Sequence, residues 1–187
     1  MTDPRSGVLA LLRKHAAQKL DAHEAAMTAD TIRFVEAHAD CLLRSCVPGH
    51  LTGSAWIVSA DRARTLLTHH HKLDKWLQLG GHADGQEDLL AAALREAQEE
   101  SGLTRLRVVA PEVFDVDRHW IPPRKSEPGH YHYDLRFMLE ADPAEPLVIS
   151  NESKDLAWIE VARVTALNPE ESMARMVRKT MAAFRSG

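Results

Sequence analysis

The chain has 187 residues, a formal net charge of −4 and a sequence pI near 6.2. This length suits one domain with a real core and a short extension. The acidic balance excludes a partner such as long DNA or RNA, because binding it requires a basic surface that neutralises many phosphates. The first residues carry no apolar signal core, and no run approaches the roughly 18 apolar residues of a membrane span, so we expect a cytoplasmic protein with no membrane partner.

Residues 1–48 predict a helical extension ahead of the domain. Apolar residues recur at helical steps in two sets: Leu9, Leu12, Ala16 and Leu20, then Ile32, Val35, Ala39 and Leu42. Thr28 or Asp30 is the expected cap of the second helix, which continues to about Arg44. The apolar stripes must be buried, so they predict either a homodimer interface or a wall of the binding pocket. Cys41 and Cys46 have no metal-site or disulfide spacing, and we expect both to be unreactive thiols.

A proline-glycine break at 47–50 opens the main domain, residues 49–187. Short runs at 55–58 and 64–67 predict a hairpin, and Gly80-Gly81 a tight loop. The chain then predicts a helix over 87–101 closed by Gly102, strands at 106–116, 131–139 and 156–161, a long loop between the first two of these strands, and a terminal helix from Pro169 to about Phe184. Strands mixed with helices predict an α/β fold.

Three carboxylates lie on one face of the helix predicted over 87–101. Glu96, Glu99 and Glu100 stand at i, i+3 and i+4, where like charges repel and weaken an isolated helix. A hard divalent cation removes this repulsion, and carboxylate oxygens are the ligands that Mg²⁺ prefers while it shares itself with substrate phosphates. An acidic triplet alone is more often a solvated face, so the neighbouring residues decide between the two interpretations.

Those neighbours form a longer motif. Residues 81–103 read GHADGQEDLLAAALREAQEESGL, in which Gly81 is followed by Glu87, then by Arg95-Glu96, Glu99-Glu100 and Gly102 at the spacing of the Nudix box. The chain therefore resembles the Nudix hydrolase family, and the resemblance extends over roughly residues 50–187. It implies an α/β/α sandwich with a mixed β-sheet, preceded here by the two-helix extension.

The resemblance also implies roles for the box residues. Glu96, Glu99 and Glu100, with the backbone carbonyl of Gly81, are the expected ligands of Mg²⁺ or Mn²⁺. Glu87 and Arg95 are expected to tie the loop to the helix without touching substrate. Support of this kind matters, because catalysis by positioned groups falls steeply when they are loosely held.

The implied reaction is attack of water on one phosphorus of a diphosphate in a nucleotide substrate. The general base is either Glu96 or a carboxylate on a later loop, for which Glu152 is the candidate. The first substrate class is a nucleoside diphosphate sugar such as ADP-ribose, and the second is a nucleoside triphosphate. A non-catalytic Nudix-fold nucleotide sensor is the alternative, although such a module often has a broken box. A prenyl diphosphate isomerase needs a catalytic cysteine in the domain, and Cys41 and Cys46 precede it.

Further residues are candidates for contact with substrate. Alternation along 130–134 places His130, His132 and Asp134 on one strand face, so His132 or Asp134 either faces the pocket or belongs to a buried hydrogen-bonded pair. Arg118 and Lys75 are candidates for binding phosphates, and Trp120 and Trp76 for stacking on a base, with Trp76 equally suited to the core. The adjacent histidines 69–71 cannot converge on one ion, because neighbouring strand residues point to opposite faces.

Overall fold

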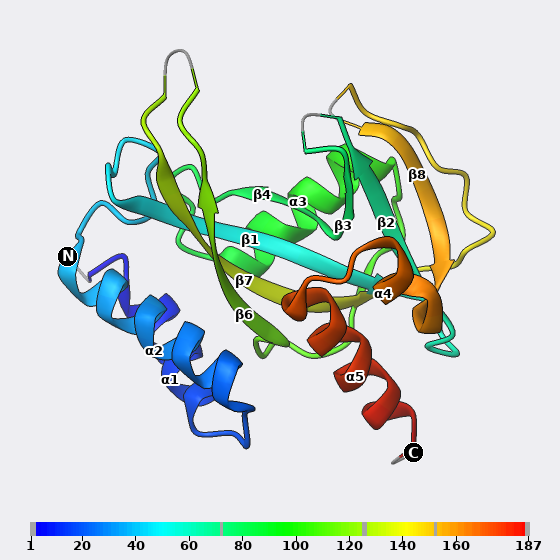
Figure 1. The fold of residues 1–187 in the computed structure, drawn as a ribbon, viewed down its shortest axis with the longest axis horizontal. Helices are drawn as coiled ribbons and strands as arrows, with labels where there is room; N and C mark the ends of the chain where they lie inside the picture. Colours follow the sequence, from blue (N-terminus) through cyan, green and yellow to red (C-terminus); the bar gives the residue numbers. More distant parts are fainter. Residues whose placement is uncertain (1–2, 72, 125–126, 152, 186–187) are drawn as a thin grey trace. The chain divides into compact units, whose positions relative to one another are not determined.

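The computed structural model describes residues 3–71, 73–124, 127–151 and 153–185 (Figure 1). The chain combines helices with one mixed set of strands, which confirms the predicted α/β class. The helices are α1 Ser6–Ala16, α2 Ala22–Ala37, α3 Leu89–Ser101, α4 Val164–Leu167 and α5 Glu171–Arg185, with a 3-10 turn at Val161–Arg163. The strands are β1 Gly49–Val58, β2 Arg64–His70, β3 Lys75–Leu77, β4 Leu79–His82, β5 Arg107–Val108, β6 Asp115–Ile121, β7 His130–Glu140 and β8 Ser153–Glu160.

Hydrogen bonds join these strands in the order β3-β2-β1-β7-β5, with β4 paired to β1, β6 to β7 and β8 to β2. By contacts the chain divides into two compact units. The first unit contains Met1–Ser54, Gly81–Ala93 and Pro111–Phe137, and the second contains Ala55–Gly80, Leu94–Ala110 and Met138–Gly187. The predicted boundary between an extension at 1–48 and a domain at 49–187 follows the sequence and stays a prediction.

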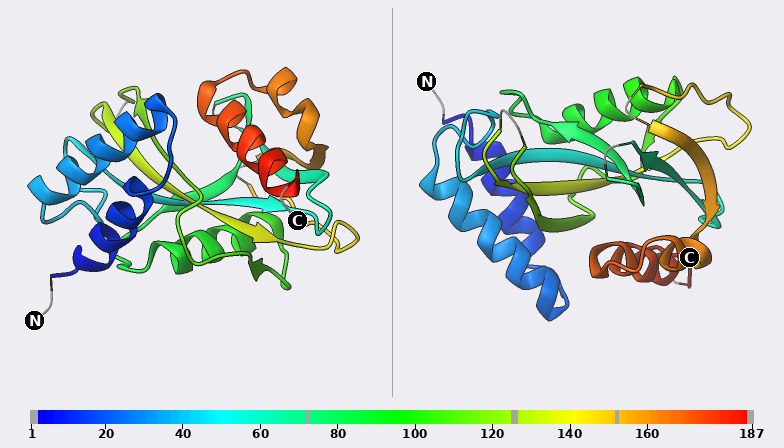
Figure 2. Two further views of the ribbon diagram at one scale, coloured as in Figure 1. Left: turned by 90° about the horizontal axis from the view of Figure 1, so that it is seen from below. Right: turned by 45° about the horizontal axis from the view of Figure 1, so that its top comes forward.

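Helices α1 and α2 lie side by side in the first unit (Figures 1 and 2). The cap of α2 is Asp21, whose extended backbone lets its carboxylate accept the Glu24 N–H at 2.8 Å. The prediction of Thr28 or Asp30 as the cap was therefore wrong, since both lie inside the helix. Thr28 Oγ1 instead donates to the Glu24 carbonyl at 2.8 Å. The helix also ends earlier than predicted, at Ala37.

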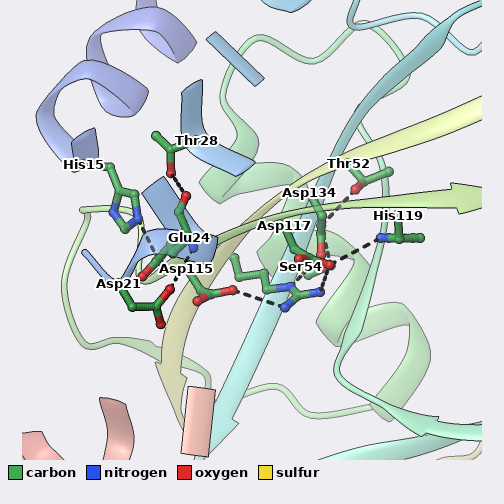
Figure 3. Close-up of polar contacts among 11 residues, drawn as sticks. His15, Asp21, Glu24, Thr28, Thr52, Ser54, Asp115, Asp117, His119 and Asp134 are labelled. Atoms are coloured by element: carbon green, nitrogen blue, oxygen red, sulfur yellow. Dashed lines mark hydrogen bonds and ion pairs between the residues drawn. The ribbon is translucent and has the colours of Figure 1, made fainter. Parts of the chain in front are cut away.

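Leu12 and Val35 of the predicted apolar stripes are buried within the chain itself, whereas Ala16 and Ala39 are exposed. Val8 and Leu12 of α1 and Phe34 and Val35 of α2 belong to one core cluster with side chains of β6 and β7. Between the helices, the buried His15 ring lies 2.8 Å from Glu24 Oε1 and 3.0 Å from the Val113 carbonyl (Figure 3). Because the stripes already have partners, they no longer supply a reason to expect a homodimer, which stays an untested prediction.

Strand β6 departs most from the predicted elements. The expected strand over 106–116 is two short pieces, β5 and the start of β6, and part of the expected loop is β6 itself. Strand β6 pairs antiparallel with β7 from Asp115↔Arg136 to Ile121↔His130. Its aspartates obscured the strand pattern, because charged residues are rare in strands and these two are buried against an arginine.

In the second unit, β2 pairs antiparallel with β8, from Arg64↔Glu160 to His70↔Ser153 (Figure 1). The core contains Trp56, whose indole N–H donates to Thr180 Oγ1 of α5 at 2.9 Å. Helix α5 follows α4 directly and contacts it (Figure 2). Within the described residues, no helix combines the length and the apolar character that a membrane span requires.

Candidate functional site

Helix α3 presents the three box glutamates, and its local structure follows from its sequence. The side chain of Asp88 accepts the Ala91 N–H at 3.0 Å and so caps the first turn. Ala93 and Ala97 are buried, so the helix has one apolar face and one carboxylate face. Gly102 ends the helix with φ of 72°, a left-handed conformation that suits glycine.

The carboxylates differ in their surroundings. Glu96 Oε1 lies 2.6 Å from Arg95 Nη1, and Glu99 Oε2 lies 3.5 Å from the same nitrogen. Glu100 is 7% exposed, and its Oε2 accepts the backbone N–H of Gly80 at 3.0 Å. Glu99 is the most open of the three, with 61% of its side chain exposed. Arg95 therefore lies beside two of the glutamates, and the third is held by strand β4, which precedes the helix.

The donor set of this face fits a hard divalent cation. The three side chains offer carboxylate oxygens from one helix face, which is the chemistry that Mg²⁺ and Mn²⁺ prefer. Glu96 and Glu100 are each held at one oxygen by the contact to Arg95 or Gly80. Such restraint positions a ligand before a metal arrives.

Two other predicted members of the box site are less defined. Glu87 is exposed, and its predicted tie to Arg95 stays a prediction, while Arg95 contacts Glu96 and Glu99 as described. Glu152, the second candidate for the general base, lies outside the described residues. The metal role of the Gly81 carbonyl likewise stays a prediction.

Strands β6 and β7 hold a buried ionic cluster in the first unit. Arg136 lies 2.8 Å from Asp134, 3.1 Å from Asp115 and 3.4 Å from Asp117 (Figure 3). Asp134 also accepts hydrogen bonds from Thr52 and Ser54 of β1, both at 2.8 Å. This complete set of partners favours a structural role for Asp134, and its contact with substrate stays a prediction.

Opposing effects set the charge states in this cluster. Burial alone would raise the pKa of Asp134, but the Arg136 charge, His119 and the hydrogen bonds bring this pKa below its ordinary value. Burial disfavours the charged form of Arg136, yet its three aspartates raise the pKa of this arginine above the usual value. The cluster is thus an arginine that neutralises part of a buried acidic group.

His132, the other candidate on β7, belongs to a group of histidines. His130 Nε2 lies 3.3 Å from His132 Nε2, and the His50 ring centroid lies 4.8 Å from that of His130 and 4.9 Å from that of His132. His82 and His119 approach His132 at ring-centroid distances of 5.0 and 5.3 Å. The alternation at 130–134 correctly predicted that His130 and His132 share a face. It gave no indication of His50, which pairing between distant strands brings to them.

The remaining candidates have partners of their own. Arg118 pairs with Asp30 of α2 at 2.8 Å and lies 4.9 Å from the centre of the Tyr131 ring. Trp120 is 50% exposed beside the same ring. These contacts leave their predicted roles in phosphate binding and base stacking untested.

Two candidates lie in the second unit. Lys75 on β3 pairs with Glu170. Trp76 stacks on His69 across the β2–β3 pair with ring centroids 5.1 Å apart. Contact of Lys75 with substrate phosphates stays a prediction, and Trp76 has a packing partner without any ligand.

Comparison with known proteins places this geometry in context. The chain matches the NUDIX domain model over residues 50–180. A solved Ap4A hydrolase from C. elegans, a binary complex, is 19% identical, with 73% of this chain and 98% of that chain covered and a TM-score of 0.59. A NUDIX family hydrolase from Clostridium perfringens is 24% identical, covering 72% and 97% of the two chains, with a TM-score of 0.54.

The dihydroneopterin triphosphate pyrophosphohydrolase of E. coli is 17% identical, covering 69% and 92%, with a TM-score of 0.54. The curated proteins contain no match to the sequence. At these identities the likeness shows the fold. It is the α/β Nudix fold with a mixed sheet that the box predicted, and here two helices precede it.

Proposed function

Because the chain belongs to the NUDIX domain family, whose members are generally pyrophosphohydrolases, we propose that it hydrolyses a diphosphate linkage in a nucleoside diphosphate derivative. The observation that carries this proposal is the carboxylate face of α3. All three glutamates of the box are present and share one helix face. Arg95 contacts Glu96 and Glu99, and the Gly80 N–H donates to Glu100. Together with the complete box, this arrangement supports a divalent cation as the ligand of the cluster.

Glu96, Glu99 and Glu100 would hold Mg²⁺ or Mn²⁺ in this proposal. The bound cation would neutralise charge on the non-bridging oxygens of the diphosphate and on the leaving phosphate. Glu100 would hold strand β4 at Gly80 through its hydrogen bond, and Arg95 would fix the Glu96 carboxylate. These residues therefore act by placing charge before the substrate binds, which lowers the cost of reorganisation in the transition state.

Water also needs a base that accepts its proton. We assign this step first to Glu96, whose side chain is 16% exposed and whose Oε1 is engaged by Arg95. Its second oxygen would accept the proton as the oxygen of water bonds to phosphorus and the P–O bond to the leaving phosphate breaks. Glu152 remains the alternative base on the later loop.

The substrate class is the finer part of the proposal. We place nucleoside diphosphate sugars such as ADP-ribose first and nucleoside triphosphates second. The named compounds of two structural neighbours, Ap4A and dihydroneopterin triphosphate, belong to those proteins, and each contains a phosphoanhydride of the kind proposed here. Action on such soluble metabolites fits the cytoplasmic location expected from the sequence.

Ion-exchange chromatography of the reaction products, with Mg²⁺ or Mn²⁺, tests the proposal against nucleotide sugars, nucleoside triphosphates and dinucleoside polyphosphates. The blank is Glu100→Gln, which keeps an oxygen to accept the Gly80 N–H but removes the charge. The matched control is Glu36→Gln on the exposed face of α2. A substrate lost in the blank and kept in the control supports the proposal. Binding of these nucleotides without any cleavage would favour the non-catalytic sensor.

A further inference from the structure

The first unit contains a group of histidines that the box chemistry does not use. His50 lies on β1, and His130 and His132 lie on β7. One ligand atom from each of these three residues lies within 4.8 Å of the other two. We propose that His50, His130 and His132 bind one transition-metal ion of the zinc class, at a site separate in its residues from the glutamates of α3.

His50 supplies the first reason. Its side chain is 4% exposed, and within the described residues neither of its ring nitrogens has a hydrogen-bond partner. Buried polar atoms are nearly always satisfied, and each exception requires an explanation. A metal ion bound to one ring nitrogen gives that atom a partner that the protein itself does not provide.

The contact between His130 and His132 supplies the second reason. His130 Nδ1 lies 2.9 Å from the Pro128 carbonyl oxygen, to which its N–H donates. The Nε2 atom of neutral His130 is then a bare lone pair, and it faces His132 Nε2 at 3.3 Å. Without a cation, His132 must donate its own Nε2 proton there. A bound cation takes the place of that proton, which shifts to His132 Nδ1.

The hydrogen bond to Pro128 resembles the outer support of known metal sites. A metal-binding histidine usually donates its other ring N–H to a carbonyl or carboxylate, and this fixes the ring and its tautomer. His130 already has that arrangement. Its Nε2 is therefore oriented before any ion binds.

Distances favour a tetrahedral ion. Two nitrogens 3.3 Å apart, each about 2.1 Å from zinc, subtend about 104° at the metal, close to the tetrahedral angle of about 109°. The widest separation in the group, 4.8 Å, exceeds the roughly 3.4 Å between ligands of such an ion, so one ring moves by about 1 Å on binding. His82 lies next to the group, with its ring centroid 5.0 Å from those of His50 and His132.

Ligand type decides which metal is bound. All three candidate ligands are imidazoles, and His50 and His130 are buried. Neutral imidazoles suit Zn²⁺, Co²⁺, Ni²⁺ and Cu²⁺, whereas Mg²⁺ prefers oxygen. The two sites of the chain therefore select different ions.

Equilibrium dialysis of the tag-free, chelator-treated full chain against Zn²⁺, with metal counted per chain, tests the inference. It is performed on a variant with Glu96, Glu99 and Glu100 all changed to Gln, which removes the box ligands. We expect one tightly bound ion in this variant. Failure of the hydrolase proposal leaves this result unchanged, because the variant has no box site.

In that background, His50→Ala and His132→Ala should each lower the Zn²⁺ affinity by more than the roughly 10–100-fold that loss of an outer-shell partner costs. His71→Ala, at an exposed histidine outside the group, should leave the affinity unchanged. The inference is overturned if the variant with all three glutamates changed binds no zinc tightly. It is also overturned if adding His50→Ala to that variant leaves the Zn²⁺ affinity undiminished.

Co²⁺ provides a measurement that needs no histidine variant. An intense visible absorption of four-coordinate Co²⁺, displaced by one equivalent of Zn²⁺, is expected from a histidine site of this kind. A weak absorption typical of six-coordinate Co²⁺ would contradict it, even where His50→Ala fails to fold.

Discussion

The substitution Arg136→Met tests the buried ionic cluster of β6 and β7 by removing its arginine. The side chain of Arg136 is 3% exposed, and those of its partners Asp115, Asp117 and Asp134 are between 0% and 9% exposed. Methionine fills much of the same volume without the charge. The variant therefore removes the guanidinium group that lies 2.8 to 3.4 Å from each of three buried carboxylates.

Breaking a buried ion pair by removing one partner costs about 3–5 kcal/mol. Against a total stability of about 5–15 kcal/mol, this loss is a large fraction. For a chain of this size it corresponds to a fall in Tm of about 6–20 °C. Arg136→Lys keeps the charge but lacks the planar fork, so we expect a smaller loss of about 1.5–3 kcal/mol.

The wild type and Arg136→Met differ in unfolding free energy, and the pH dependence of this difference distinguishes a loss of charge interactions from a loss of packing. In the wild type the pKa of Asp134 lies below its ordinary value of 3.8, so its contribution to stability is present above pH 3.8 and is lost as the pH falls through the folded pKa. In Arg136→Met, burial without the arginine raises this pKa. Protonation of Asp134 at mildly acidic pH then removes a buried charge from the variant. The difference in unfolding free energy between the wild type and the variant therefore decreases as the pH falls from 7 toward 5.

Urea unfolding followed by circular dichroism at several pH values measures both quantities. The control is Arg178→Met, which removes an exposed arginine that pairs with Glu171 and should cost under about 1 kcal/mol. A loss in Arg136→Met no larger than in this control, or a gap that widens in acid, would refute the electrostatic account.

Gly53→Ala should lower the free energy of unfolding, because an added Cβ would lie 2.7 Å from the backbone oxygen of Leu89 and the strand or helix must shift. Its control is Gly7→Ala at an exposed position of α1, where the added Cβ meets nothing within 4 Å and should raise stability by about 0.5–1 kcal/mol in the same urea assay. Equal effects of the two substitutions would contradict the close approach at Gly53. Burial raises the pKa of Cys41 to about 11 and that of Cys46 to about 12, so both thiols stay protonated at pH 8. Ellman's reagent should therefore modify the native chain at least roughly tenfold more slowly than the unfolded chain. Equal rates would show that the thiols are accessible to the reagent in the native chain.

Local patterns predicted much of the fold. The box helix, the strand over 131–139 and the terminal helix correspond to α3, β7 and α5 within a few residues. In each, apolar residues recur at one clear period and glycine or proline marks an end, so short-range information was sufficient. The spacing of the box residues similarly predicted the Nudix fold from the sequence alone.

Long-range partners explain the failures. Asp117 fell in the predicted loop because the arginine that neutralises it, and also Asp115, lies on another strand. His50 was missed as a site residue for the same reason, since β1 and β7 bring it to His130 and His132 across a long stretch of chain. Asp21 was missed as a cap because the apolar periodicity continued past the true break between the helices.

The most direct test of the central claim is ³¹P NMR of ADP-ribose incubated with Mg²⁺ and the chain, compared with Glu99→Gln. Glu99 has the most exposed carboxylate of the three, so this change removes a ligand charge with little effect on packing. The account predicts that the two diphosphate signals are replaced by two phosphate-monoester signals, and that Glu99→Gln slows this conversion by orders of magnitude. Equal rates in the two proteins would contradict the assignment of catalysis to the carboxylate face of α3.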